Sequence, residues 1–120
     1  MPEYKSIRPS HTSTVDSTLL DYRVKKMISI VTEKFKQQYP NNKQPEWDSV
    51  DGRKYIRIFR IDHDGTRSVW CFINPQTGAV LKPASWKGPA KGVRYNIMDD
   101  TSYETMCRRI DPHGSFLYNY

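Results

Sequence analysis

The chain has 120 residues, of which 27% are charged and 12% aromatic, and its formal net charge is +6. This length predicts one domain with a single modest core, and the mixture of apolar and charged residues excludes a wholly disordered chain. The sequence contains no apolar run near the roughly 18 residues of a membrane-spanning helix, and its N-terminus lacks the apolar core of a secretory signal. We therefore expect a protein without membrane attachment that stays inside the cell that makes it.

The positive charge is unevenly distributed. Residues 1–64 carry 12 basic and 9 acidic side chains, residues 65–98 carry 5 basic and no acidic ones, and residues 99–120 carry 2 basic and 4 acidic ones. A purely basic segment in the middle of the chain favours an anionic partner, either a nucleic acid or an acidic protein surface. The competing interpretation is ordinary solubility, because many soluble domains have a net charge of roughly 2–8.

The N-terminal third of the chain predicts an arm and a long helix. Residues 1–12 mix proline, serine and charge without periodicity, so we expect a flexible arm followed by one domain over 13–120. The next apolar residues recur every three or four positions and predict an amphipathic helix near 15–38 that ends before Pro40. Either a Ser13–Asp16 capping box, Thr14 or Asp16 is expected to cap it. The apolar stripe consists of Leu20, Val24, Met27, Ile28, Val31 and Phe35. The basic residues of the helix are expected to form a solvated face, and they are Arg23, Lys25, Lys26, Lys34 and Lys36.

The middle of the chain predicts an antiparallel sheet. Segments 46–50, 53–61, 67–73 and 79–82 are rich in β-forming residues and are separated by turns at 51–52, 62–66 and 74–78. The expected fold is α+β, with the long helix on a meander of three to four strands and a short helix after residue 98. Alternation predicts Ser68, Trp70 and Phe72 on one face of the third strand, and Val69, Cys71 and Ile73 on the other. Arg57 and Arg60 are expected on opposite faces.

Residues 80–97, VLKPASWKGPAKGVRYNI, predict a stiff basic loop. Two prolines limit its freedom in the unfolded chain, and Gly88 and Gly92 allow the backbone to approach a ligand closely. Its cations recur every three to five residues, a spacing that suits successive phosphates, and its aromatic side chains suit stacking on bases. The predicted nucleic-acid-binding residues are Lys82, Trp86, Lys87, Lys91, Arg94, Tyr95 and Asn96, with Arg67, Arg57 and Arg60 widening the surface. Alternatively, Trp86 anchors the loop in the core.

The C-terminal part predicts a short helix carrying Tyr103, Met106, Cys107 and Ile110, capped by Asp99, Asp100 or Ser102, and a last apolar piece over 116–118 that forms a strand or a docked tail.

Motifs of catalysis and cofactor binding are missing from the sequence. It contains no phosphate-binding G-x-x-x-x-G-K-[ST], no G-x-S-x-G, no H-E-x-x-H and no C-x-x-C. His63 and His113 lie in turn-like segments, although the acidic neighbours of His63 also suit acid–base work. Two cysteines, Cys71 and Cys107, are too few for a disulfide scaffold and are typical of a reducing cytosol. We therefore expect no metal, no cofactor and no enzymatic activity.

One segment carries a resemblance. Residues 69–97, VWCFINPQTGAVLKPASWKGPAKGVRYNI, resemble part of small uncharacterised proteins of tailed phages and large DNA viruses that share a T-G-x-V-L-K-x-A-S-W-K-x-P-A-K segment. The chain departs from that pattern at Pro83 and Tyr95. The resemblance implies a viral origin, in the cytoplasm of an infected host cell or in the virion, and no mechanism.

These observations lead to three functional hypotheses. The first is a non-catalytic viral protein that binds a polyanion, DNA or RNA, through residues 80–97. The second is a structural or interaction protein, either a minor virion component or an inhibitor that docks on an acidic host protein. The third is a small-nucleotide binder or enzyme with a pocket lined by His63, Trp86 and Arg94.

Overall fold

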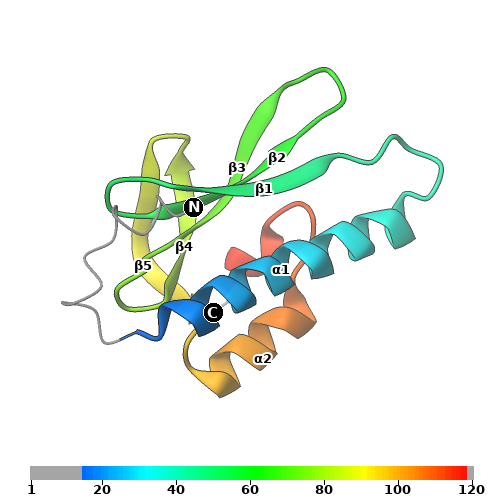
Figure 1. Cartoon of the computed structure of the whole chain (residues 1–120). Helices are drawn as coiled ribbons and strands as arrows, with labels where there is room; N and C mark the ends of the chain where they lie inside the picture. The colour runs from blue at the N-terminus through cyan, green and yellow to red at the C-terminus, as the bar shows by residue number, and fades with distance from the viewer. Residues whose placement is uncertain (1–14, 119–120) are drawn as a thin grey trace.

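The computed structural model describes residues 15–118, and the predicted flexible arm lies outside this range. Its fold is α+β: a long helix is followed by an antiparallel sheet and a short second helix (Figure 1). The sheet has five strands, in the order β1-β2-β3-β4-β5, rather than the predicted three to four. The elements are α1 (Ser17–Gln38), β1 (Glu46–Asp51), β2 (Ile56–Ile61), β3 (Arg67–Ile73), β4 (Ala79–Ser85), β5 (Gly88–Asn96), α2 (Asp100–Arg109) and a 3-10 turn (Ser115–Leu117).

Helix α1 forms where the apolar periodicity predicted it. The Asp16 carboxylate caps it by accepting hydrogen bonds from the backbone N–H groups of Thr18 and Leu19, which satisfies two donors that have no partner inside the helix. Tyr39 ends the helix directly before Pro40. The buried residues are all from the predicted stripe, and they pack on one face of the sheet: Leu20, Val24, Met27, Val31 and Phe35.

Part of the predicted solvated face of α1 instead holds α2. The Arg23 guanidinium donates to the Ile97 carbonyl at 2.9 Å and to Asp100 at 2.8 Å, and it lies 4.4 Å from the centre of the Tyr103 ring. Lys34 donates to the carbonyl oxygens of Arg108 and Ile110 at the end of α2, where a helix is short of donors. The periodicity showed correctly that these cations avoid the sheet, but it did not reveal that a second helix lies alongside.

The basic segment 80–97 is a β-hairpin and not the predicted loop. β4 pairs with β3 only at Val80 and Leu81, whereas its pairing with β5 continues to Ser85 and Gly88. Beyond Leu81 the two strands therefore form a ribbon that no third strand from residues 15–118 joins. Proline is tolerated at such edges because its missing N–H breaks no ladder, and Pro83 and Pro89 face each other there. Proline and glycine were the reason for the loop prediction, and the ribbon explains why they are compatible with strands.

A register shift changes the predicted faces of β3. Ile58 pairs with Cys71 but Phe59 pairs with Val69, so Trp70 is the extra residue of a β-bulge and has no pairing partner in β2. Trp70 therefore turns to the helix-covered face, where its ring lies 5.4 Å from that of Trp47. The prediction that Trp70 and Phe72 share a face is wrong for this reason.

The sheet buries apolar side chains on both of its faces. The main core lies between α1 and the sheet and includes Ile58, Cys71 and Ile73. On the opposite face, here called the outer face, Phe59 and Phe72 are 6% and 2% exposed, although neither α1 nor α2 lies over this face of the sheet (Figure 1). Arg60 lies on the helix side against Phe35 and Trp47, and Arg57 lies on the outer face, which confirms that these two arginines point in opposite directions.

The C-terminal elements close the helix side. Asp99 caps α2, as one of the predicted alternatives, and Met106 is its buried residue. The last apolar piece is a docked 3-10 turn whose Phe116 and Leu117 join the core. Within residues 15–118, no helix is long and apolar enough to cross a bilayer.

A pair of glycines tests the turn that leads into the basic hairpin. Gly65 and Gly78 both have positive φ, +87° and +84°, but a Cβ on Gly78 meets Asn96 Oδ1 at 2.6 Å whereas one on Gly65 meets nothing within 4 Å. We expect Gly65→Ala to lower the free energy of unfolding by about 1–2 kcal/mol from backbone strain alone, and Gly78→Ala to lower it clearly more. Urea denaturation of both variants measures the difference, and equal losses would contradict the close contact.

Candidate nucleic-acid interface

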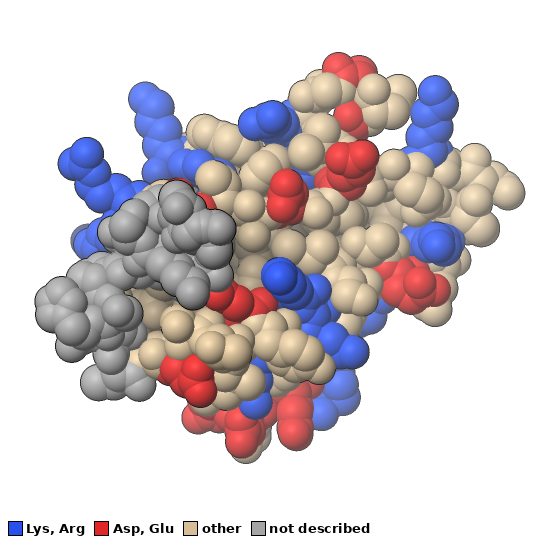
Figure 2. Space-filling view, viewed as in Figure 1, with Lys and Arg blue, Asp and Glu red and all other residues tan. Residues whose placement is uncertain are grey.

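The β4–β5 hairpin carries its cations on an exposed tip. Ser85 pairs with Gly88, so Trp86 and Lys87 form a two-residue turn. Lys87 and Lys91 are exposed, and no acidic residue occurs between Gly65 and Met98. Basic side chains accordingly project from the hairpin end of the molecule, whereas basic and acidic side chains are mixed over the rest of the visible face (Figure 2).

Trp86 combines the two roles that the sequence left open. Its ring lies 5.6 Å from the ring of Phe59, edge to face, which attaches the hairpin tip to the outer face of the sheet. The residue is nevertheless 38% exposed, far more than the core tryptophans Trp47 at 8% and Trp70 at 5%. Trp86 is thus attached to the sheet and still offers ring surface to solvent.

Arg57 fixes the backbone of the tip. Its Nε donates to the Trp86 carbonyl oxygen at 2.9 Å, and its guanidinium carbon lies 4.7 Å from the centre of the Trp86 ring and 5.6 Å from that of Phe72. Stacking on aromatic rings is a property of the planar, weakly hydrated guanidinium group. Arg57 therefore joins the hairpin tip to β2 by a hydrogen bond and by contacts with two rings.

Arg67 extends the same surface. It is exposed at the start of β3, and its guanidinium carbon lies 5.4 Å from the centre of the Phe59 ring. Phe59 is thus covered by Trp86 and by Arg67. We call the set Arg57, Phe59, Arg67, Trp86, Lys87 and Lys91 the outer-face patch.

Lys82 lies elsewhere. Its Nζ is 4.5 Å from the centre of the Tyr118 ring, and Tyr118 follows the turn that packs on the helix side. Lys82 and Trp86 therefore do not share a surface, although they are only four positions apart in the sequence. Arg94 is half-buried in β5 and its terminal nitrogen approaches the Gly92 carbonyl oxygen at 3.5 Å.

Tyr95 and Asn96 have structural contacts in place of the predicted ligand contacts. Tyr95 is 6% exposed, and its hydroxyl donates to the Phe116 carbonyl oxygen in the core. The Asn96 amide donates to the Thr77 carbonyl oxygen and accepts from the Met98 N–H, which closes the end of the sheet. The buried Tyr95 ring cannot stack on a base, and both the amide nitrogen and the amide oxygen of Asn96 already make hydrogen bonds within the protein. We therefore remove these two residues from the candidate site.

The remaining reactive groups stay apart. Among residues 15–118, no three His, Cys, Asp or Glu side chains gather in a way that could hold a metal ion. His63 is exposed at the β2–β3 turn, whereas His113 accepts or donates a 2.9 Å hydrogen bond with the Tyr39 hydroxyl. Both cysteines are free thiols, and burial raises the pKa of Cys71 far above its usual value and also raises that of Cys107. Such thiols are poor nucleophiles at neutral pH.

The family match covers nearly the whole chain. A model of a family of unknown function, DUF7717, matches residues 8–119. The chain belongs to this family. No curated protein and no solved structure matches it. The family assigns no activity, so the function is argued from the geometry.

The sequence missed the part that β2 plays in the site. Phe59 and Arg57 are about thirty residues away from Trp86 in the chain, and only the curl of the hairpin over the outer face brings them together. One sequence signal pointed that way: Arg57 and Phe59 alternate with Ile56 and Ile58, so the strand has large side chains on both faces, which is typical of a strand covered on both sides.

Replacement of Trp86 measures how strongly the tip is attached. Because Trp86 keeps 38% of its surface exposed, we expect Trp86→Ala to lower the free energy of unfolding by about 1–2 kcal/mol, less than the roughly 3–5 kcal/mol of a buried aromatic residue. Urea denaturation gives the value, with Trp70→Ala as the buried comparison. A loss for Trp86→Ala as large as that for Trp70→Ala would identify Trp86 as a core anchor.

Proposed function

We propose that the protein is a non-catalytic binder of single-stranded nucleic acid, with the outer-face patch as the binding surface. The observation that carries this proposal is the half-open Trp86 ring, which is fixed from below and flanked by exposed cations. Proteins that bind single strands with little sequence preference combine cations that follow the backbone with rings on which bases stack. The outer-face patch supplies both elements at the tip of one hairpin.

The cations of the outer-face patch are available to phosphates. Lys87 and Lys91 are exposed and have no ion pair among residues 15–118, and the Arg57 guanidinium makes one hydrogen bond there, through Nε. The two terminal nitrogens of Arg57 thus remain for a phosphate, which guanidinium groups grip with two parallel bonds. Arg57 serves as a positioning group for Trp86 and as a phosphate contact at once.

Pre-organisation lowers the entropic cost of binding. The tip is a two-residue turn held by Arg57 and Phe59, and Pro83 and Pro89 stiffen the ribbon behind it. Ordering flexible side chains and loops on association costs free energy that a rigid surface avoids. A stiff basic ribbon is for this reason better suited to a polyanion than a mobile lysine-rich tail of equal charge.

The biological setting belongs to the same proposal. The resemblance of residues 69–97 to proteins of tailed phages and large DNA viruses favours action on nucleic acid in the cytoplasm of an infected cell or in the virion. An acidic protein surface is the alternative partner of the same patch, and the binding experiments below separate the two.

Salt dependence tests the phosphate contacts. Anisotropy of labelled single-stranded and duplex oligonucleotides over a salt series gives log–log slopes of about −0.7 and −0.9 per phosphate contact respectively. We expect Lys87→Ala with Lys91→Ala to flatten the single-strand slope by about 1.4, the contribution of two contacts. The matched control is Lys25→Ala with Lys26→Ala, which removes the same charge from the exposed side of α1 and is expected to leave the slope nearly unchanged.

Equal flattening by both double variants would show that only net charge matters. The absence of binding to any oligonucleotide at low salt would reject the nucleic-acid proposal in favour of an acidic protein partner.

Stacking on Trp86 makes a second, separate prediction. Base–aromatic stacking contributes about 1–3 kcal/mol per base, so we expect Trp86→Ala to weaken single-strand affinity by roughly 5- to 150-fold and duplex affinity much less. Trp86→Tyr keeps a ring and is expected to retain most of the affinity. If Trp86→Ala weakens both ligands equally, the ring holds the hairpin in place and does not stack.

A further inference from the structure

A groove on the helix side of the sheet is a second candidate site, separate from the outer-face patch. It has a volume of about 360 Å³ and lies between β1–β4 and the C-terminal segment. Pockets for small molecules begin at roughly 300 Å³, so the groove suits a compact ligand. The residues used below are Trp47, Arg60, Trp70, Lys82, His113 and Tyr118, all of which line it.

The lining is cationic. Arg60 and Lys82 enter the groove from β2 and β4, and none of the residues between 15 and 118 that line it is acidic. The nearby Asp62 pairs with Arg60 Nε at 2.7 Å, which leaves the two terminal nitrogens of that guanidinium for another partner. Asp111 directly precedes the lining residues Pro112 and His113 in the sequence. Its carboxylate accepts hydrogen bonds from the backbone N–H groups of His113 and Phe116. The groove therefore favours an anionic group.

The lining is also aromatic. Tyr118 is 63% exposed and has the Lys82 ammonium 4.5 Å from the centre of its ring, so an anion bound by Lys82 has a flat apolar surface beside it. Trp70 forms a fixed wall, because its indole N–H donates to the Asp111 carbonyl oxygen at 3.0 Å.

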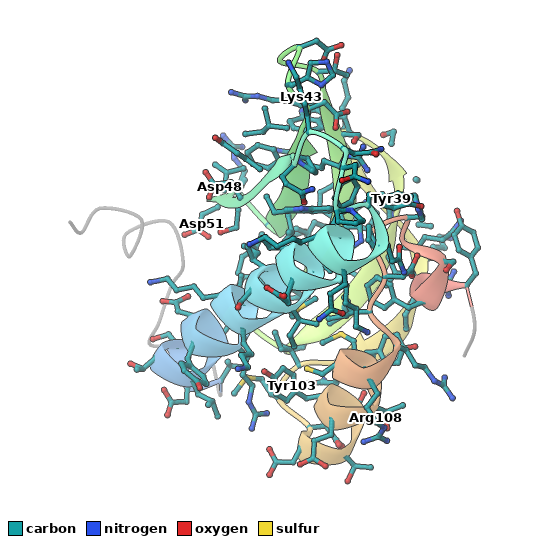
Figure 3. All side chains as sticks on the ribbon, turned by 90° about the vertical axis from the view of Figure 1, so that its right-hand side faces the viewer. Tyr39, Lys43, Asp48, Asp51, Tyr103 and Arg108 are labelled. Atoms are coloured by element: carbon teal, nitrogen blue, oxygen red, sulfur yellow. The ribbon has the colours of Figure 1, made fainter. Side chains whose placement is uncertain are left out.

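The position of His113 is fixed by the fold. The Tyr39 hydroxyl at the end of α1 meets one ring nitrogen of His113 at 2.9 Å, and Figure 3 shows Tyr39 beside the C-terminal segment. Gly114, with φ of +79°, begins the 3-10 turn against the Trp70 ring, where a Cβ would lie 3.7 Å from the indole. These contacts set one wall of the groove before any ligand arrives.

We propose that this groove binds a nucleoside monophosphate, with the phosphate between Arg60 and Lys82 and the base against Tyr118. A ligand with one compact anion and one planar ring matches the two features that the groove combines. The site lies on the helix side of the sheet and does not share a residue with the outer-face patch. This proposal can therefore be tested independently of the proposed binding of nucleic-acid strands.

Fluorine NMR of protein labelled with 5-fluorotryptophan tests the proposal, because the three tryptophans report on the two surfaces. Trp47 and Trp70 line the groove and Trp86 lies on the outer face, and Trp86→Phe assigns the Trp86 signal. On titration with adenosine and uridine monophosphates, we expect saturable shifts of the Trp47 and Trp70 signals. Adenosine alone and inorganic phosphate alone are expected to bind at least tenfold more weakly.

The variants Lys82→Ala and Tyr118→Ala are expected to weaken monophosphate binding at least tenfold, and Lys87→Ala, the matched lysine of the other face, to leave it unchanged. Tyr118 and Lys82 are at least partly exposed, so both variants are expected to fold, which the retained spectrum of unligated protein checks. Equal affinity for monophosphate and inorganic phosphate, shifts confined to Trp86, or no saturable shift would each overturn the proposal.

Discussion

Between Ile58 and Phe59 the register of β2 against β3 shifts, and Trp70 is the extra residue. Without the shift, strict alternation along β3 would place Arg67 and Trp70 on the faces opposite to those they occupy. Arg67 would leave the outer face, and Phe59 would lose the guanidinium group that covers part of it. Trp70 would leave the helix side, and the groove would lose the wall that the Asp111 carbonyl fixes. Both candidate surfaces thus depend on a single bulge, a feature that commonly redirects side chains near functional sites.

The hairpin divides its charge between these two surfaces. A strand presents successive side chains to opposite faces, so a basic strand inside a sheet cannot deliver all its cations to one ligand. Lys82 lies by Tyr118 on the helix side, whereas Lys87 is at the tip that curls onto the outer face. A loop of the same composition could have gathered its cations around one phosphate. The strand geometry instead favours two separate ligands or one long ligand that the tip alone contacts.

Much of the fold follows from the sequence, because α1 and the three turns of the meander are specified locally. The stripe of α1, its Asp16 cap and its end before Pro40 need only neighbours within a few residues. The β4–β5 hairpin was not predicted, because proline and glycine usually mark loops but are also allowed in a two-stranded ribbon. No local pattern shows that β3 stops pairing with β4 after Leu81. The second role of Arg23 and Lys34 was missed for the same reason, since a helix surface that faces water and one that faces α2 look alike in one sequence.

The candidate site was predicted best where residues act through charge and exposure, and worst where they act through position. Lys87, Lys91 and Arg67 were chosen as cations, and each is exposed. Tyr95 and Asn96 were chosen for their chemistry, but Tyr95 belongs to the core and Asn96 closes the sheet. Arg57 shows the opposite case: its hydrogen bond to the Trp86 carbonyl oxygen and its contact with the ring require the whole fold. A guanidinium group has five N–H donors, and Arg57 uses one of them for the Trp86 carbonyl oxygen. The side chain that positions the hairpin tip therefore also has donors for a ligand bound there. A lysine at position 57 has no planar group for the ring, so it would supply the charge without the positioning.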